Sequence, residues 1–307
     1  MLVLARHKPP RRVAVAAAHD PALLHALAEA QRQQLVGETL LFGRRDAILA
    51  LARDAGLVLR PDNVHHEPDD AIAALRAAAA VRTGEADVLM KGHLHTDDFL
   101  RGVLDRERGL RTGVLMSHCF VLEHPSEERL LLLTDSGMNI APTLEQKAEI
   151  ALNAIYLAEI LGIERPRVAA VAAVELVNPR MPATLDAAAL AQMSARGQFS
   201  NGVIDGPLGL DNAISPRAAA LKGMGGEVAG RADVLLMPDI EAGNIAVKMF
   251  SFLCRGKVAG VLVGAAAPVV LTSRADTPEA KLFSLALATV MADYRRHERL
   301  KIGKVHY

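Results

Sequence analysis

Short runs of valine, leucine, isoleucine and alanine alternate along this chain with longer stretches in which apolar residues recur at helical spacing. The short runs are apolar without interruption, which is typical of parallel strands that helices cover on both faces. The pattern predicts strands at 13–18, 39–42, 87–90, within 113–123, and at 130–136, 167–176, 202–205, 234–239, 258–264 and 268–273. It therefore indicates an α/β protein with mostly parallel sheets.

Three predicted helices have clear limits. Asp20 is placed to cap a helix whose first residue is Pro21. A long amphipathic helix is expected over 142–163, and the alternation of strands and helices restarts after it, so we expect another domain to begin there. The last helix is expected over 278–298.

Composition removes several classes of function. The 307 residues are 51% hydrophobic, enough for a substantial core, and 35 basic residues balance 35 acidic ones. A chain without net charge and with 3% aromatic residues does not suit a nucleic-acid or membrane-surface partner. No apolar run is long enough for a membrane span or a signal peptide, and the two cysteines lack disulfide or zinc spacing. We expect a cytoplasmic protein.

Polar residues follow most of the predicted strands. In open parallel sheets, ligands bind beyond the carboxyl ends of the strands, so these positions are candidates for a site. Capping a helix is the alternative role for each Ser, Thr, Asp or Asn among them. They are Lys91, His93, His95, Ser117, His118, Asp135, Ser136, Asn139, Glu175, Asn178, Asp205, Asp239, Glu241, Asn244, Thr272, Ser273, Arg274 and Asp276.

Two further patterns are weak. His93 and His95 resemble a metal pair, but the sequence offers no third ligand, so no metal is expected. The glycines of 222–230 lack the context of a phosphate or dinucleotide loop and are read as a turn.

Arg274 is the strongest single candidate for binding a charged ligand. In the stretch VVLTSRADTPEAK, 269–281, it follows an apolar strand and precedes a helix. A permanent planar cation beside backbone N–H groups at a helix N-terminus holds a phosphate or carboxylate well. A structural ion pair with a loop acid is the alternative.

Several long stretches together resemble the phosphate acetyltransferase and phosphate butyryltransferase family. They cover nearly the whole chain, and the last two are closer to the butyryl branch. They are KGHLHTDDFLRGVL, LLTDSGMNIAPTLEQKAEIALNAI, VNPRMPATLDAAAL, IDGPLGLDNAISPRAA, MPDIEAGNIAVK and GAAAPVVLTSRADTPEAKLFSLALA. Such enzymes interconvert acyl-CoA plus phosphate with acyl phosphate plus CoA.

The resemblance implies an architecture as well as an activity. It implies two three-layer αβα domains of the isocitrate/isopropylmalate dehydrogenase-like kind, with the active site in the cleft between them. The first domain would comprise 1–138 plus 261–307 and the second 139–260. It further implies a homodimer, no metal, CoA as a substrate rather than a cofactor, and no hydratase-type domain ahead of the transferase.

The family's catalytic serine and arginine fall on Ser273 and Arg274. In the acetyl branch a catalytic carboxylate follows about two helical turns later, where this chain has Ala280, so Asp276 or Glu279 would have to serve. We assign catalysis to Ser273, Arg274 and Asp276. Substrate binding is assigned to Lys91, Arg111, Ser117, Asp135, Asn139, Asp205, Asp211 and Thr272.

The chemistry needs a clamp for the phosphate, a donor for the oxygen that gains charge, and a group for the thiol proton. Arg274 with Lys91 or Arg111 would be the clamp and Ser273 the donor. Asp276, Asp205 or Asp211 would take the thiol proton. We expect direct transfer in a ternary complex, because Cys119, the alternative nucleophile, is read as a core residue.

Three other functions stay open at this point. They are an acyltransferase that takes its acyl group from a carrier protein, a metal-dependent dehydrogenase on a related fold, and a non-catalytic acyl-CoA-binding protein.

Overall fold

The structure is a computed structural model that describes residues 1–124, 127–296 and 302–306. Contacts within the chain divide it into two compact units. Unit 1 comprises residues 1–114 and 259–299, and unit 2 comprises 115–258 and 300–307. The domain boundaries expected from the sequence, after 138 and after 260, stay a prediction.

The sheet of unit 1 has the strand order β3-β2-β1-β4-β11-β10. Neighbouring strands are parallel except β10 and β11, which are antiparallel. The strands are β1 (Arg11–Ala16), β2 (Val36–Gly43), β3 (Val64–His66), β4 (Val88–Lys91), β10 (Val258–Val263) and β11 (Val269–Val270). Their buried valines, leucines and alanines form the middle of this unit's core.

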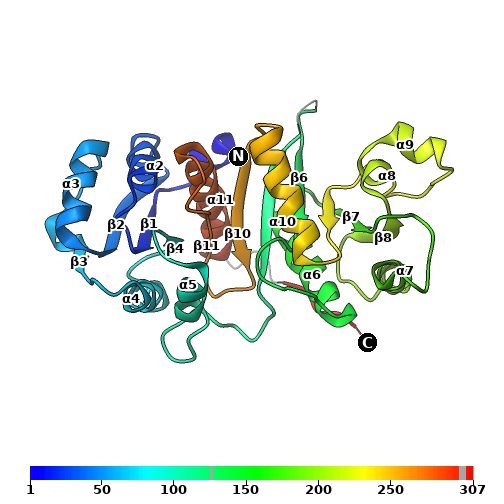
Figure 1. Ribbon diagram of the computed structural model, residues 1–307, viewed down its shortest axis with the longest axis horizontal. Coiled ribbons are helices and arrows are strands. Elements are labelled where there is room, and N and C mark those ends of the chain that lie inside the picture. Colours follow the sequence, from blue (N-terminus) through cyan, green and yellow to red (C-terminus); the bar gives the residue numbers. More distant parts are fainter. Residues whose placement is uncertain (125–126, 297–301, 307) are drawn as a thin grey trace. The chain divides into compact units, whose positions relative to one another are not determined.

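Helices cover both faces of this sheet. Figure 1 shows α2 (Pro21–Arg32), α3 (Arg45–Ala55) and α11 (Pro278–Arg296) on one face, and α4 (Asp70–Arg82) and α5 (Thr96–Val103) on the other. The short helices α1 (Leu2–Arg6) and η1 (Pro61–Asn63) complete the unit.

Polar contacts cap helix α2 and fasten helix α11 to strand β1 in unit 1. Asp20 accepts a hydrogen bond from the Leu23 N–H at 3.2 Å, which confirms the predicted cap of α2. Arg11, buried in β1, donates to Asp293 of α11 at 2.5 Å, and Lys8 pairs with the same carboxylate at 3.0 Å. Removing Asp293 would leave a buried guanidinium without its acid, which is strongly destabilising.

The sheet of unit 2 has the order β5-β6-β9-β7-β8 and is parallel except for the β5–β6 pair. The strands are β5 (Ser117–Glu123), β6 (Leu130–Thr134), β7 (Arg167–Val171), β8 (Val203–Leu208) and β9 (Val234–Leu236). Helices α6 (Leu144–Ile160) and α7 (Pro182–Ala195) lie on one face (Figure 1). The other face carries α8 (Leu210–Ile214), α9 (Pro216–Leu221), α10 (Ile240–Lys248) and the π-helix η2 (Met249–Leu253).

The predicted α/β class with mostly parallel sheets is confirmed, and each predicted strand overlaps an observed one. Helix α6 begins two residues later than expected because Thr143 and Gln146 form a capping box. The run expected as a strand over 268–273 forms only a two-residue strand, Val269–Val270. None of the helices in the described part of the chain combines the length and apolar character that crossing a bilayer requires.

Candidate active site

The carboxyl ends of three parallel strands bring the first group of candidate residues together in unit 1. Strand β4 lies between β1 and β11, with Lys91 opposite Ala16 and Met90 opposite Val270. Residue 91 therefore lies beside the loop that leaves β11. The next residue must be Gly92, because a Cβ there would lie 2.3 Å from the Ala17 carbonyl oxygen.

The loop 271–277 is folded by its own polar groups. The Asp276 carboxylate accepts the Ser273 N–H at 2.7 Å, and the Ser273 hydroxyl accepts the Ala275 N–H at 3.3 Å. Thr277 accepts the Ala280 N–H at 3.2 Å, so Thr277 caps α11. Asp276 is not the cap; its carboxylate holds the turn that presents Ser273.

Lys281 fastens this loop to α11. Its buried ammonium donates to the Ser273 carbonyl at 3.1 Å and the Asp276 carbonyl at 2.9 Å, and it lies 4.0 Å from the Asp20 carboxylate. The sequence reasoning missed this residue. The available signal was its position in the first turns of the helix, because helical side chains lean toward the helix N-terminus and hence toward the preceding loop.

Arg274 is the exposed cation of the loop. Its guanidinium makes no hydrogen bond or ion pair with any other described residue, so its five N–H donors are available. Thr272, directly before Ser273, is buried and its hydroxyl oxygen has no hydrogen-bond partner among the described residues. The alternative of a structural ion pair for Arg274 is therefore not realised in the described part of the chain.

Lys91 is a buried cation without an acid partner among the described residues. Its side chain is 2% exposed, and its ammonium makes one long hydrogen bond, 3.4 Å, to the Gly92 carbonyl. Burial lowers the pKa of Lys91 to about 8. The charges that act on this pKa are Arg274 and Lys281, which lower it further, and Asp20 and Asp276, which raise it.

Arg111 lies on a loop that is tied to the turn between β10 and β11. The Leu110 carbonyl accepts the Ala266 N–H at 2.7 Å, and the Thr112 hydroxyl donates to the Gly264 carbonyl at 2.6 Å. The Arg111 side chain is exposed and has no partner among the described residues. It is thus a second guanidinium available to an anion.

Asp135, Asn139 and Ser117 lie together in unit 2, where their polar atoms form hydrogen bonds with other groups of the protein. Asp135 follows β6 and accepts backbone N–H groups of residues 137, 138 and 139 at 2.9–3.1 Å. The Asn139 amide donates to Asp135 at 2.5 Å and to the Met116 carbonyl at 2.9 Å. Burial raises the pKa of Asp135, and these hydrogen bonds oppose that rise. Ser117 is buried and accepts a hydrogen bond from Asn153 at 3.0 Å.

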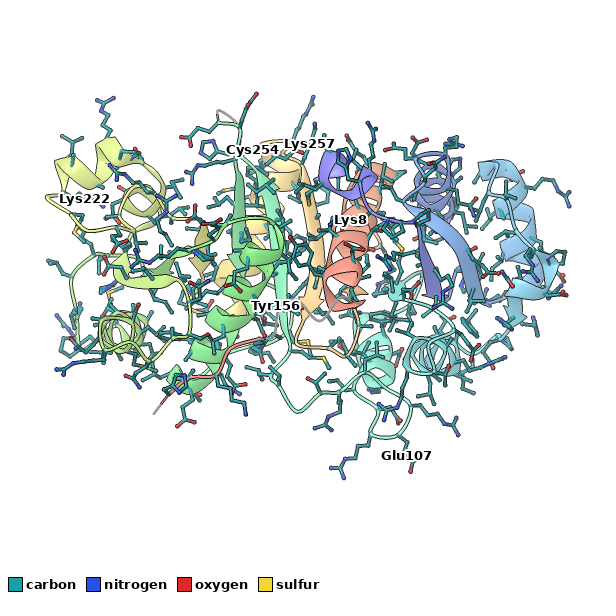
Figure 2. The ribbon with its side chains drawn as sticks, turned by 180° about the vertical axis from the view of Figure 1, so that it is seen from behind. Lys8, Glu107, Tyr156, Lys222, Cys254 and Lys257 are labelled. Atoms are coloured by element: carbon teal, nitrogen blue, oxygen red, sulfur yellow. The ribbon has the colours of Figure 1, made fainter. Side chains whose placement is uncertain are left out.

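Asp205 lies within β8 of the same unit, and Asp211 lies in α8, which follows this strand. Lys222, labelled in Figure 2, pairs with Asp211 at 3.0 Å and with Glu175 at 3.2 Å. The hydrogen bond from Lys222 lowers the pKa of Asp211, which makes this carboxylate a weaker proton acceptor. Asp205 is half-buried and, in the part of the chain that the structure describes, accepts only its neighbouring Gly206 N–H, at 2.8 Å, so one of its oxygens is available.

The remaining candidates give no second site. Cys119 is fully buried, and burial raises the pKa of its thiol, which agrees with a core role rather than a nucleophile. The ring of His93 lies 5.8 Å from that of His19, and His95 precedes α5 without a side-chain cap bond. Among the described residues, no group of three or more His, Cys, Asp or Glu side chains is arranged to hold a metal ion.

Fold and site together define a class of protein. Parallel strands end at an exposed guanidinium, a hydroxyl and a buried lysine, with no metal-ligating cluster in the described ranges. This arrangement is that of an α/β enzyme that holds an anionic group on cationic side chains.

Comparison with known proteins makes the assignment specific. The family model described as "Phosphate acetyl/butaryl transferase" matches residues 61–289. The chain is 46% identical to a phosphate butyryltransferase of Clostridium acetobutylicum, over 95% of this chain and 97% of that one. It is 43% identical to a phosphate acetyltransferase of Thermotoga maritima, over 92% and 95% of the two chains. A solved branched-chain phosphotransacylase from Enterococcus faecalis is 33% identical, with a TM-score of 0.79 over 92% of this chain and 98% of its own. The chain belongs to the phosphate acetyl/butyryl transferase family, so the resemblance drawn from its sequence is confirmed.

Proposed function

We propose that this protein transfers a short- or medium-chain acyl group between coenzyme A and inorganic phosphate, interconverting acyl-CoA plus phosphate with acyl phosphate plus CoA. Membership of the family supports the reaction. The observation that carries it in the structure is the free Arg274 guanidinium next to Ser273, on a loop beside the buried Lys91. A dianionic phosphate is a ligand that suits such a group of cations.

The proposed mechanism is direct transfer in a ternary complex. Arg274 binds the phosphate through its planar fork, and Arg111 adds positive charge. The Ser273 hydroxyl, whose oxygen accepts the Ala275 N–H, donates to the oxygen that gains charge. A covalent route through Cys119 is disfavoured by the burial of that thiol.

The unit 2 candidates take more limited roles in this proposal. Asp135, Asn139 and Ser117 shape the protein around the ends of β5 and β6, since their polar atoms bind protein groups. Asp205 is better suited than Asp211 to contact a substrate, because Asp211 is paired with Lys222.

Several further properties belong to the proposal. Coenzyme A acts as a substrate, and neither a metal nor a cofactor takes part. Both cysteines are unpaired thiols, which suits the reducing cytoplasm. The protein acts as a homodimer, since Ile245, Met249, Phe252 and Leu253 leave an apolar surface exposed on α10 and η2. Neither nucleic acid nor membrane is a partner.

The experiment is thiol release from acetyl-, butyryl- and longer acyl-CoAs, with and without inorganic phosphate. We expect release that depends on phosphate and a specificity constant that is higher for butyryl-CoA than for acetyl-CoA. Each added methylene buried in an apolar pocket contributes about 0.8 kcal/mol. Absence of phosphate-dependent release would refute the function, and a preference for acetyl-CoA would refute the acyl assignment alone.

A further inference from the structure

The carboxylates that surround the loop of Ser273 and Arg274 already have structural duties. Asp276 accepts the Ser273 N–H at 2.7 Å. Asp20 caps α2 through one oxygen and faces the Lys281 ammonium, 4.0 Å away, with the other. Position 280 is an alanine, and Glu279 is solvent-exposed on the first turn of α11. The described part of unit 1 therefore offers no shielded, unengaged carboxylate beside this loop.

The proposed reaction nevertheless has to move a proton. Acyl-CoA and the phosphate dianion give an acyl phosphate dianion and a neutral thiol, so the proton of the phosphate must reach the departing sulfur. In the opposite direction the thiol proton must reach the phosphate. A single group that can accept and donate a proton between these two atoms satisfies both directions.

Within the described part of the chain, Lys91 is the titratable group at this position that has no acid partner and is buried from water. Its ammonium is buried at the end of β4, and its one hydrogen bond, to its neighbour's carbonyl, is 3.4 Å long. A second buried lysine, Lys147 of unit 2, shows the usual arrangement, because it pairs with Asp186 at 2.7 Å. A lysine left unpaired in a buried site is suited to losing its proton.

We propose that Lys91 is a catalytic residue that relays the proton between the phosphate and the sulfur of coenzyme A. This inference rests on the proposed function. As a phosphate oxygen bonds to the thioester carbonyl carbon, the neutral amine takes the remaining P–OH proton, and the C–S bond breaks. The resulting ammonium gives this proton to the thiolate, so the amine is regenerated and the free thiol leaves. No oxidant, reductant or additional reactant is needed.

The electrostatics of the site are consistent with this role. Burial, Arg274 and Lys281 hold the pKa of Lys91 at about 8, against the opposing effect of Asp20 and Asp276. At pH 7 roughly a tenth of such a lysine is the neutral amine, compared with far less than a hundredth for an ordinary lysine. The value is also close to that of an ordinary thiol, about 8.5, which favours transfer in both directions.

The pH dependence of the phosphate-consuming direction separates a relay from a clamp. A relay needs the neutral amine, so kcat/KM for phosphate, expressed per concentration of the dianion, should rise about tenfold from pH 7 to a plateau above pH 8 to 9. A lysine that only holds phosphate must stay charged, so kcat/KM would fall over the same range. A falling profile overturns the proposal without any variant.

Lys91→Arg is the matching substitution, because it keeps a positive charge but cannot lose its proton near neutral pH. We expect kcat to fall at least a hundredfold, KM for phosphate to stay within about fivefold, and the rise with pH to vanish. The control is Lys147→Arg, which keeps its pair with Asp186 and should leave both kcat and the pH profile unchanged.

Added alkylamines provide a second measurement if Lys91→Arg does not fold. In a folded Lys91→Ala variant, the rate restored by amines should increase with their basicity, which a purely structural lysine would not produce. Absence of rescue together with a wild-type pH profile that does not rise would overturn the relay. Loss of phosphate-dependent thiol release from the wild-type protein would instead refute the proposed function itself.

Discussion

Arg274 combines two properties that rarely coincide in a structural residue, exposure and a complete lack of described partners. An arginine that stabilises a fold usually donates hydrogen bonds to a carboxylate or carbonyl, as Arg167 does to Asp233 at 2.8 Å. The five N–H donors of Arg274 make no hydrogen bond to a described residue. The loop that carries Arg274 is held by hydrogen bonds of Asp276 and Lys281 with the backbone of Ser273. The backbone at Arg274 is therefore held in place while its guanidinium is available, which suits a side chain that binds an incoming anion.

Replacing this guanidinium tests the clamp. Arg274→Ala should lower kcat/KM for phosphate-dependent acyl transfer at least a hundredfold, which corresponds to about 3 kcal/mol of transition-state stabilisation. Arg274→Lys should recover little, because a point charge cannot bind two oxygens in the same plane. Exposed Arg32, which pairs with Glu29 on the same helix, serves as the control position. A folded Arg274→Ala protein with near-normal turnover would remove the assignment.

The burial of the Lys91 ammonium also leads to a prediction about the stability of the fold. Its native pKa of about 8 lies below its value of about 10.5 in the unfolded chain, so the unfolded state binds more protons between these values. The buried charge therefore destabilises the protein below pH 8, and this cost disappears as pH rises toward 10.5. Lys91→Met should raise the free energy of unfolding by on the order of 1–3 kcal/mol at pH 7, with a smaller gain at pH 10.

Urea denaturation of the wild type and of Lys91→Met at both pH values provides the measurement. An equal or lower stability of the methionine variant at pH 7 would show that the buried ammonium has a stabilising partner. Activity should be lost in the same variant, so stability and turnover should move in opposite directions.

At the scale of elements, the loop between β11 and α11 is where sequence reasoning and structure differ most informatively. The apolar run VVLTS predicted a longer strand, yet pairing ends at Val270 because the following residues fold into a turn around Asp276. Local signals correctly predicted the cap of α2 by Asp20 and the start of α11 at Pro278. Asp276, for which the sequence offered a helix cap or a catalytic acid, instead accepts the Ser273 N–H, and Thr277 caps α11.

Contacts between distant segments explain what the sequence could not provide. Lys91 and Arg274 were each recognised as strand-end residues, but their proximity depends on the register of β4 against β11. Asp20 could in principle pair with Lys91, but in the fold its carboxylate faces Lys281 instead, and no local sequence pattern specifies this choice. Periodicity thus predicted which residues lie at strand ends. Which of these side chains are close together, and which of them have ionic partners, could be known only from the fold.

The turn itself yields a prediction at Asp276. Asp276→Asn keeps an oxygen that can accept the Ser273 N–H, so the loop and at least a third of the activity at neutral pH should be retained. Asp276→Ala removes this acceptor, and kcat/KM should fall about tenfold or more as Ser273 loses its position. If Asp276→Asn instead loses a hundredfold in the reaction of acyl phosphate with CoA, with recovery at high pH, then Asp276 is the proton acceptor.

At the scale of the whole molecule, the apolar surface of α10 and η2 predicts the state of assembly. Phe252 is 57% exposed and Leu253 is 79% exposed, next to Met249 and Ile245 on the same segment. A contiguous apolar surface of this kind commonly marks an interface, and identical chains most often pair by a two-fold axis.

Light scattering should therefore give a mass of two 32.7 kDa chains for the wild type. The double substitution Phe252→Glu and Leu253→Glu should give a single chain, because charge at the centre of an apolar interface is costly to bury. Leu221→Glu is the control, since Leu221 is equally exposed on α9 and outside this surface. A single-chain mass for the wild type would contradict the homodimer.

The discontinuity of unit 1 has a consequence for how the protein is made. On the ribosome, residues 1–114 emerge first, but the strand that pairs with the free edge of β4 is encoded after residue 258. At about 5–20 residues per second, the intervening segment takes roughly 7–30 s to synthesise, and during that time the edge of β4 is open to other chains. The loop of Ser273 and Arg274 is translated only after this interval. A nascent chain therefore cannot release a reactive acyl phosphate before its own fold is closed, and chaperone protection matters most in the interval before that closure.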